Sequence, residues 1–451
     1  MHNVILRNSI KKFTFLVALV CTFTFYPYQN YIHGETTLDT HQTLTAMVSS
    51  RTKWLLTAPA KKGSSKANPL LLAFTMDGDF HPITFKKSGG QFRAHVQDHP
   101  TPSDLAANVP PTQLPDGSFV GAGKSGMFIN VDTIERRWLF VWPSIRPSIL
   151  SKPVVLDSDD VAMVGVDGSL LLFKKKEGRW LQTQLIEAKI ARVLPDAILT
   201  TADLDGDGRK ELIVPAVPSR RFKHAILGDD IEPTEIHAYR FNNKSLKFMA
   251  KYSAAKNGVF ETIGTLASDL DKDGKQEILV TQSDSDSGAA HLVLGMKEGK
   301  FTLKARSSAI GTGNRWSHLL GVFYIDGNAP KILAVETPHL SGFLLALRLS
   351  GKRLRERARI AGVTTHSVGS RNLWEFTLLR RRGVVEVVMQ EASRQHLSGL
   401  ALFGNRWSFR WSRPIPSPVR SNILAADFNQ DTKDDIAFVD QSGLVHIYLS
   451  R

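Results

Sequence analysis

The sequence predicts an all-β protein built from one repeated antiparallel unit, and three observations support this prediction. Short acidic segments are each followed directly by an apolar run of strand length. The apolar runs recur at steps of 49 to 66 residues. Each is followed by two further apolar runs separated by polar turns. Because stacked units of this period share a core, we expect residues 38–451 to form a single β-propeller of seven or eight four-stranded antiparallel blades.

Six units align on the strand that follows the acidic turn. These strands begin, at steps of 51, 66, 54, 55 and 49 residues, at Asp160, Glu211, Glu277, Lys331, Glu386 and Asp435. Two weaker units precede them, with apolar runs near Trp54 and Leu70 and near Phe119 and Trp138. The total is eight anchors. The step of 41 residues from Phe119 to Asp160 is short, however, which suggests that one anchor is not a full blade.

The last blade needs a strand from elsewhere in the chain. Its final apolar run, Val445 to Leu449, comes just before Arg451 and leaves the blade one strand short. An open blade would expose a row of unpaired backbone groups at its edge. We therefore expect a segment near Thr43 to Val48 to pair with the last blade and close the ring.

Residues 1–33 have the pattern of a signal peptide or an N-terminal membrane anchor. Arg7, Lys11 and Lys12 precede an apolar run from Phe13 to Phe25, and turn-forming residues follow from Pro27. The run is short for a membrane span of about 20 residues, and no small-residue cleavage site follows it, so both interpretations stay open. We expect export to the periplasm, the extracellular space or the envelope, with membrane contact only through this segment.

The net charge indicates which partners to expect, and the cysteine content indicates whether disulfides are present. The formal net charge is +14, which is compatible with an anionic partner surface. The basic runs Lys174 to Lys176 and Lys352 to Arg353 fall at expected hairpin tips, which is typical of a solvated surface, so we do not expect a nucleic-acid partner. The single cysteine, Cys21, lies inside the apolar leader, so disulfides cannot stabilise the rest of the chain.

Three acidic segments have the ligand spacing of a calcium loop. Ca²⁺ takes roughly six to eight oxygens, which acidic side chains at loop positions 1, 3, 5 and 9 and a backbone carbonyl at position 7 can supply. The candidate ligands, in order of position, are Asp203, Asp205, Asp207, Arg209 and Glu211; Asp269, Asp271, Asp273, Lys275 and Glu277; and Asp427, Asn429, Asp431, Lys433 and Asp435. The sharp turn at position 6 favours glycine, which Gly208 and Gly274 provide and Thr432 does not. We expect two calcium sites, with the third loop as a weaker candidate.

This pattern resembles a known repeat family. An Asp-x-Asp-x-Asp-Gly loop that ends at position 9 and runs into an apolar strand is similar to the calcium loops of FG-GAP and VCBS repeats, the blades of integrin-α-type β-propellers. The lead-in from Phe260 through Gly264 to Asp269 resembles that family as well. The resemblance implies Ca²⁺ in the blade turns and partner binding, and it implies little about catalysis.

The remaining loops are degenerate. The unit from Leu378 to Glu386 keeps the position 9 acid but has Arg380 and Arg382 at ligand positions. Because a guanidinium can replace a cation beside a carboxylate, we expect this loop to hold no metal. The loops at Asp157 and Asp326 are shorter than the three complete ones, so we expect no tight metal site there.

Recognition is expected at the end of the ring opposite the acidic loops. Successive antiparallel strands reverse direction, so loops joining strands 2 and 3 lie opposite those joining strands 1 and 2. The longest of them, residues 218–233, accounts for the 66-residue step.

No catalytic motif is recognisable, so we assign no catalytic residues and favour a noncatalytic scaffold that binds a protein or glycan. The alternative is a propeller enzyme, a lyase or hydrolase, that acts on polysaccharide.

Overall fold

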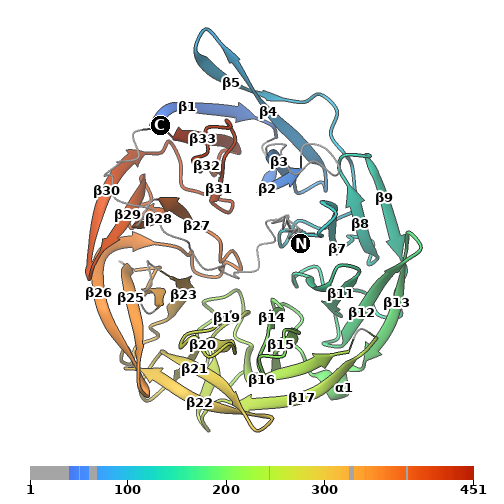
Figure 1. The fold of residues 1–451 in the computed structure, drawn as a ribbon, viewed down its shortest axis with the longest axis vertical. Helices are drawn as coiled ribbons and strands as arrows, with labels where there is room; N and C mark the ends of the chain where they lie inside the picture. Colours follow the sequence, from blue (N-terminus) through green and yellow to red (C-terminus); the bar gives the residue numbers. More distant parts are fainter. Residues whose placement is uncertain are drawn as a thin grey trace, which may run out of the picture.

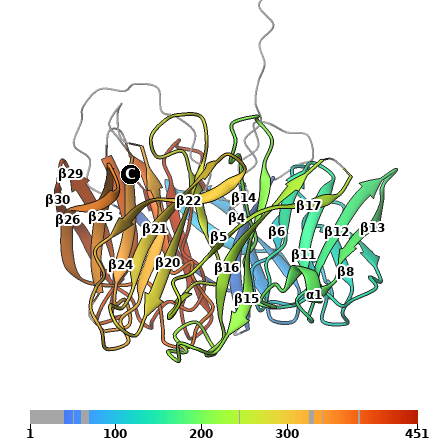
Figure 2. The same ribbon diagram turned by 90° about the horizontal axis from the view of Figure 1, so that it is seen from below.

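The chain folds as a β-propeller. The computed structural model describes residues 40–49, 51–59, 69–242, 244–324, 330–340, 342–381 and 384–450. Within these ranges it has 33 strands and one short helix, α1 (Ala188–Ala191). The strands form eight four-stranded antiparallel blades around a central axis (Figure 1). Seen from the side, the strands run between two loop-bearing faces (Figure 2).

The first four blades follow one another along the chain. From the innermost strand outward, blade 1 contains β2 (Thr52–Pro59), β3 (Pro69–Thr75), β4 (Phe80–Ser88) and β5 (Gln91–Val96); blade 2 contains β6 (Thr112–Gln113), β7 (Phe119–Ala122), β8 (Phe128–Asp132) and β9 (Arg137–Val141); blade 3 contains β10 (Val154–Asp157), β11 (Asp160–Val164), β12 (Leu170–Lys176) and β13 (Arg179–Ile186); blade 4 contains β14 (Thr200–Ala202), β15 (Glu211–Ser219), β16 (Glu232–Phe241) and β17 (Leu246–Ser253).

The other four blades complete the ring. Blade 5 has an inner strand in two pieces, β18 (Gly258–Phe260) and β19 (Leu266–Ser268), followed by β20 (Glu277–Asp284), β21 (Ala290–Lys297) and β22 (Lys300–Ser307); blade 6 contains β23 (Ser317–Phe323), β24 (Lys331–Glu336), β25 (Gly342–Ser350) and β26 (Arg353–Thr364); blade 7 contains β27 (Phe376–Arg381), β28 (Val384–Glu391), β29 (His396–Phe403) and β30 (Arg406–Pro414); blade 8 contains β31 (Leu424–Ala426), β32 (Asp435–Val439), β33 (Leu444–Ser450) and β1 (Thr40–Met47).

The expected closure of the ring is confirmed. The N-terminal strand β1 pairs antiparallel with β33 and becomes the outer strand of blade 8, with Leu44 opposite Ile447. Leu44 and Ala46 are buried, and they belong to the apolar cluster between blades 8 and 1. The first described strand therefore covers the edge that the last strand would otherwise expose.

Every one of the eight anchors lies in a blade of its own. The suggestion that the 41-residue step marks an incomplete unit is wrong, because blade 2 has all four strands. The step is short because the strands themselves are short: β6 has two residues, β7 has four, and β8 and β9 have five each. The short step along the chain therefore reflects short strands, and no strand of blade 2 is missing.

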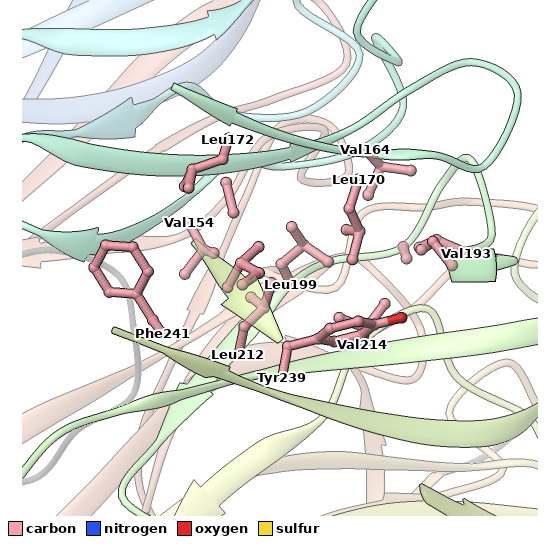
Figure 3. Packing of buried hydrophobic residues seen from close by; sticks show 14 of the residues in the cluster. Val154, Val164, Leu170, Leu172, Val193, Leu199, Leu212, Val214, Tyr239 and Phe241 are labelled. Carbon is pink, nitrogen blue, oxygen red and sulfur yellow. The ribbon is translucent and has the colours of Figure 1, made fainter. Parts of the chain in front are cut away.

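Apolar side chains fill the space between neighbouring blades. Between blades 3 and 4, Val164 and Leu172 pack with Leu212, Val214 and Tyr239 (Figure 3). A strand in the middle of a blade is covered by neighbouring blades on both faces. All five residues of β11 and all five of β32 are accordingly buried. This two-sided burial explains why the anchors are continuous apolar runs and do not alternate with polar residues.

The proposed leader lies outside the described residues, as does Arg382 in the degenerate loop of blade 7. In the part of the chain that the structure describes, no helix has the length and apolar character needed to span a membrane.

Candidate functional site

The three acidic loops occupy equivalent positions in blades 4, 5 and 8. They join β14 to β15, β19 to β20 and β31 to β32, which are strands 1 and 2 of each blade. Their places in the fold are therefore as expected, and they lie on one face of the ring, called the acidic-loop face below. Loops that join strands 2 and 3 lie on the opposite face.

The position 1 aspartate holds each loop in the same conformation. Asp203 accepts backbone hydrogen bonds at 2.8 and 2.9 Å from the amides of Gly206 and Gly208, at positions 4 and 6. Asp269 accepts the equivalent bonds at 2.7 and 3.0 Å, and Asp427 accepts them at 2.7 and 2.9 Å. The position 5 aspartate accepts a further bond from the position 7 amide in all three loops. The loops thus share one turn, set by their own side chains.

Two residues of each loop have positive φ angles. Position 6 has φ of 81° at Gly208, 86° at Gly274 and 71° at Thr432. The turn therefore forms in the third loop although its residue is β-branched, a type that strongly disfavours this region. Position 4 is also left-handed, with a glycine only in the first loop; Lys272 and Gln430 take that position in the other two.

The position 9 acids are buried at the start of strand 2. Glu211, Glu277 and Asp435 are at most 2% exposed, and each accepts a hydrogen bond from the amide at loop position 2, at 3.1, 2.8 and 2.9 Å. Burial raises the pKa of Glu211 and of Glu277, and it raises the pKa of Asp435 to about 7. Water is removed from these carboxylates without full compensation, so a nearby cation would stabilise their charged form.

Basic side chains from other strands reach two of these acids. Arg240 on β16 contacts Asp205 and lies 3.5 Å from Glu211. Lys304 on β22 lies 2.6 Å from both Asp271 and Glu277. Sequence reasoning missed both residues, because they lie on strands 3 and 4 and come near the loop only through strand pairing. Asp435 instead accepts a hydrogen bond at 2.8 Å from the amide of Ser450.

The structure brings together part of each predicted ligand set. Ligand atoms of Asp203, Asp205 and Glu211 lie within 4.8 Å of one another, as do those of Asp269, Asp271 and Asp273. Among the described residues, the Asp427 loop forms no such group of three. In the first loop Oδ1 of Asp205 is buried without a hydrogen-bond partner. An unsatisfied carboxylate oxygen beside two further carboxylates suits a hard cation, so the residues of this loop fit Ca²⁺.

Neighbouring loops are also tied to one another. The side-chain oxygen of Gln276 in the blade 5 loop accepts a hydrogen bond from the backbone amide of Asp203 at 2.8 Å. The backbone amide of Gln276 donates to the backbone carbonyl of Asp203 at 2.7 Å. Tyr324, directly after β23 of blade 6, donates to the carbonyl of Asp269. The acidic loops therefore connect three consecutive blades as well as capping their own turns.

The degenerate loops keep the buried acid at position 9, and a different side chain contacts that acid in each loop. In blade 3, Lys174 lies 2.6 Å from Asp160. In blade 7, the indole of Trp411 donates to Glu386 at 2.5 Å. The side chains of Arg380 and Arg382, which we expected beside Glu386, lie outside the described part of the chain.

The long connection on the opposite face borders an open pocket. Residues 220–231 join β15 to β16. Arg220, Arg221 and Lys223 line a pocket of about 350 Å³ together with Asp284 of blade 5 and with Arg315, which lies in the connection from β22 to β23. Four of these five side chains are basic. Arg220 is ion-paired with Asp230, and Asp284 accepts hydrogen bonds from Ser287, so the basic groups outnumber the two carboxylates. The pocket is therefore electropositive.

The tip of the same connection turns inward, so not all of the segment 218–233 is available as a recognition surface. Ile226 and Leu227 are buried in a cluster with Ile263 and Trp316. Arg371 fixes the tip through ion pairs to Asp196 at 2.9 Å and Asp229 at 2.6 Å. The two apolar residues in an otherwise charged loop are the sequence signal that could have revealed this.

The fold and the repeated blades define the class as a β-propeller. The chain is similar to the solved structures of Sqt1 from Saccharomyces cerevisiae (TM-score 0.57, 11% identity, 92% of this chain and 99% of that one) and BamB from Moraxella catarrhalis (0.50, 10%, 90% and 100%). It is also similar to the C-terminal WD40 domain of Sif2 (0.51, 10%, 92% and 99%). No family model matches the sequence, and no curated protein matches it. The likeness shows the fold alone.

Proposed function

We propose that this protein is an exported, calcium-binding β-propeller that acts without catalysis as a protein- or glycan-binding scaffold of the cell envelope or extracellular space. The observation that carries the proposal is that the two faces of the ring have different chemistry. The acidic loops stabilise blade turns on one face, and an electropositive pocket opens on the other. Export rests on the basic and apolar pattern of residues 1–33.

Calcium would be held chiefly by the position 1, 3 and 9 carboxylates of the blade 4 loop and the position 1, 3 and 5 carboxylates of the blade 5 loop. The ion would supply positive charge to carboxylates whose own hydrogen bonds already shape the turn. Arg240 and Lys304 neutralise part of that charge. The chain's residues therefore pre-organise the loops, and the ion would add stability to a turn that is already formed.

A partner would bind at the pocket on the opposite face, beside the connection from β15 to β16. Loops on a rigid scaffold commonly carry recognition. The basic side chains favour a partner with acidic groups, such as an acidic glycan or an acidic protein surface. This preference agrees with the net charge of +14 of the whole chain.

Charge reversal tests the binding face. The double variant Arg220→Glu, Lys223→Glu should lose at least tenfold in affinity for envelope polysaccharide or envelope protein, measured with the full chain by surface plasmon resonance. A matched control, Lys297→Glu with Lys300→Glu, makes the same charge change at an exposed hairpin tip on the acidic-loop face. Equal losses in both variants, or none in either, would refute the assignment of this face.

The alternative of a polysaccharide lyase or hydrolase has one feature to consider on the same face. His224 and Ser283 both contact the buried carboxylate of Glu261. Glycoside hydrolysis commonly uses two carboxylates that reach the substrate. The neighbouring acid Glu232, which the charge of Glu261 repels, is only 2% exposed. Glu261 is 0% exposed. We therefore favour binding over catalysis.

A further inference from the structure

Three loops form the walls of the electropositive pocket: the connection from β15 to β16, the hairpin from β20 to β21 and the connection from β22 to β23. Backbone hydrogen bonds join the last two. The amide of Ile310 donates to the Ala289 carbonyl at 2.9 Å, and the amide of Gly311 donates to the Ser287 carbonyl at 3.1 Å. The two loops lie so close that a Cβ at Gly288 would collide with the carbonyl oxygen of Gly311. Two walls of the pocket are therefore held together before any ligand binds.

The four basic side chains of the lining differ in whether an acid already pairs with them. Arg220 is ion-paired with Asp230. Arg221 and Arg315 donate to backbone carbonyls, which hold the guanidinium groups without cancelling their charge. Lys223 is exposed and forms no ion pair with any described residue. Three of the four cations therefore keep a charge that a ligand can meet.

The carboxylates near the pocket do not cancel this charge. Asp284, the acidic residue of the lining, accepts hydrogen bonds from its own hairpin. Outside the lining, the exposed Asp286 of the same hairpin adds a negative charge, and the exposed Lys256, two residues before the strand partner of Asp284, adds a positive one. The acids Glu232 and Glu261 are at most 2% exposed and do not line the pocket. The pocket therefore favours an anion.

Uncharged hydrogen-bonding groups lie beside the cations. The side chains of Thr312 and Asn314 line the pocket, are exposed and make no hydrogen bond with the described residues. The backbone at Gly311, Gly313 and Asn314 is left-handed, with φ of 89°, 93° and 55°, so this wall is a tight turn. A free hydroxyl and a free amide can both donate to and accept from the hydroxyl groups of a sugar. The lining thus offers more than charge.

The volume of the pocket matches one sugar ring. A cavity of about 150 Å³ holds one benzene with its six heavy atoms, so a pocket of about 350 Å³ holds about 14 heavy atoms. This is the size of one pyranose with an acid group. The side chain of an aspartate or glutamate is much smaller, and it would leave Thr312 and Asn314 without a partner. Size and lining together favour a sugar over an acidic protein side chain.

We propose that this pocket binds a single acidic sugar residue of a glycan. The carboxylate or sulfate of the sugar pairs with Arg221, Lys223 and Arg315, since guanidinium groups bind oxyanions through paired hydrogen bonds. The hydroxyl groups of the sugar bond to Thr312 and Asn314. This inference rests on the proposed function, and it narrows the partner from an acidic protein or glycan to an acidic glycan.

Calorimetric titration of the full chain with tetrasaccharides tests the proposal. A hyaluronan tetrasaccharide carries carboxylates and no sulfate, and a κ-carrageenan tetrasaccharide carries sulfates and no carboxylate. The tighter of the two therefore identifies the acid group. We expect it to bind at least tenfold more tightly than neutral chitotetraose and at least tenfold more tightly than tetraglutamate.

Two substitutions separate recognition of charge from recognition of the sugar. Lys223→Met should weaken binding of the tighter tetrasaccharide at least tenfold, whereas Lys300→Met, an exposed control on the acidic-loop face, should leave it unchanged. Thr312→Val removes an exposed hydroxyl without a hydrogen-bond partner among the described residues, so the variant should fold normally and bind severalfold more weakly.

Three results would overturn the sugar assignment. They are binding of tetraglutamate as tightly as the acidic tetrasaccharides, no binding of either acidic tetrasaccharide, and unchanged affinity in both Lys223→Met and Thr312→Val. Each leaves an acidic protein as the partner at this face and does not affect the charge-reversal test. Failure of the proposed function would appear in that test instead, as equal losses or no loss of affinity for envelope partners in the two charge-reversed proteins.

Discussion

Thr432 is one of three β-branched residues in the described part of the chain, with Val217 and Thr337, that have a positive φ. Its side chain is exposed, and its φ of 71° lies where its glycine counterparts Gly208 and Gly274 lie. A β-branched residue is strained in this region. The third loop therefore forms its turn at a cost that the first two do not bear.

Thr432→Gly should raise the free energy of unfolding by about 1 kcal/mol, because the strain is relieved and no buried contact is lost. Urea denaturation followed by tryptophan fluorescence measures the change. The reciprocal variant Gly208→Thr should lose about 1–2 kcal/mol. If Thr432→Gly destabilises the protein as much as Gly208→Thr does, the backbone interpretation is wrong.

Glu375 makes the stability of the protein depend on pH. It is 4% exposed, and burial raises its pKa to about 7, although Arg394 and Lys53 oppose the shift. Between about pH 4.5 and 7 the native state keeps a proton that the unfolded chain releases, so this residue lowers stability as pH rises through that window.

Glu375→Gln removes that dependence. The stability of the variant relative to the native sequence should rise by about 3 kcal/mol from pH 4.5 to pH 7 and stay constant above pH 7. Thermal unfolding at a series of pH values measures it. A constant difference between the two proteins across the window would show that Glu375 titrates normally in the fold.

At the scale of elements, β1 is the strand on which closure of the ring depends. This strand begins at residue 40 and pairs with β33, the last strand of the chain. Its residue Leu44 is buried between blades 8 and 1. Thr43 precedes it on the same strand with its side chain exposed. The pair offers a matched test of the closing strand.

Leu44→Ala should lower the free energy of unfolding by about 2–3 kcal/mol, as truncation of a buried leucine does. Thr43→Ala should change it by less than about 0.5 kcal/mol. Equal effects in the two variants would mean that β1 contributes pairing without packing. Differential scanning calorimetry of the full chain gives both values.

Much of the fold was predictable because its signals are local. The anchors at Glu211, Glu277 and Asp435 follow acidic turns, and two-sided burial makes them continuous, so these acids mark the start of strand 2 without any structure. The contacts of Arg240 and Lys304 with those loops were not predictable, since they depend on the pairing of β16 with β15 and of β22 with β21. The apolar pair at Ile226 and Leu227 signals burial, but their packing partners Ile263 and Trp316 are far along the chain and could not be read from a local pattern.

At the scale of the whole molecule, the two faces of the ring differ in chemistry. One face carries the carboxylate loops, which link blades 4, 5 and 6 through Gln276 and Tyr324. The other carries the electropositive pocket. A rigid ring keeps these regions apart, so that stabilisation of the turns and recognition of a partner can be altered independently.

Calcium content is the most direct test of the central proposal that the acidic loops are metal sites. We expect the purified full chain, measured by plasma emission spectrometry after equilibration with Ca²⁺, to retain at least two ions. Asp205→Ala and Asp271→Ala should each remove one, whereas the exposed control Asp286→Ala should remove none. Unchanged calcium content in Asp205→Ala and Asp271→Ala, or a protein that retains no calcium at all, would contradict the account.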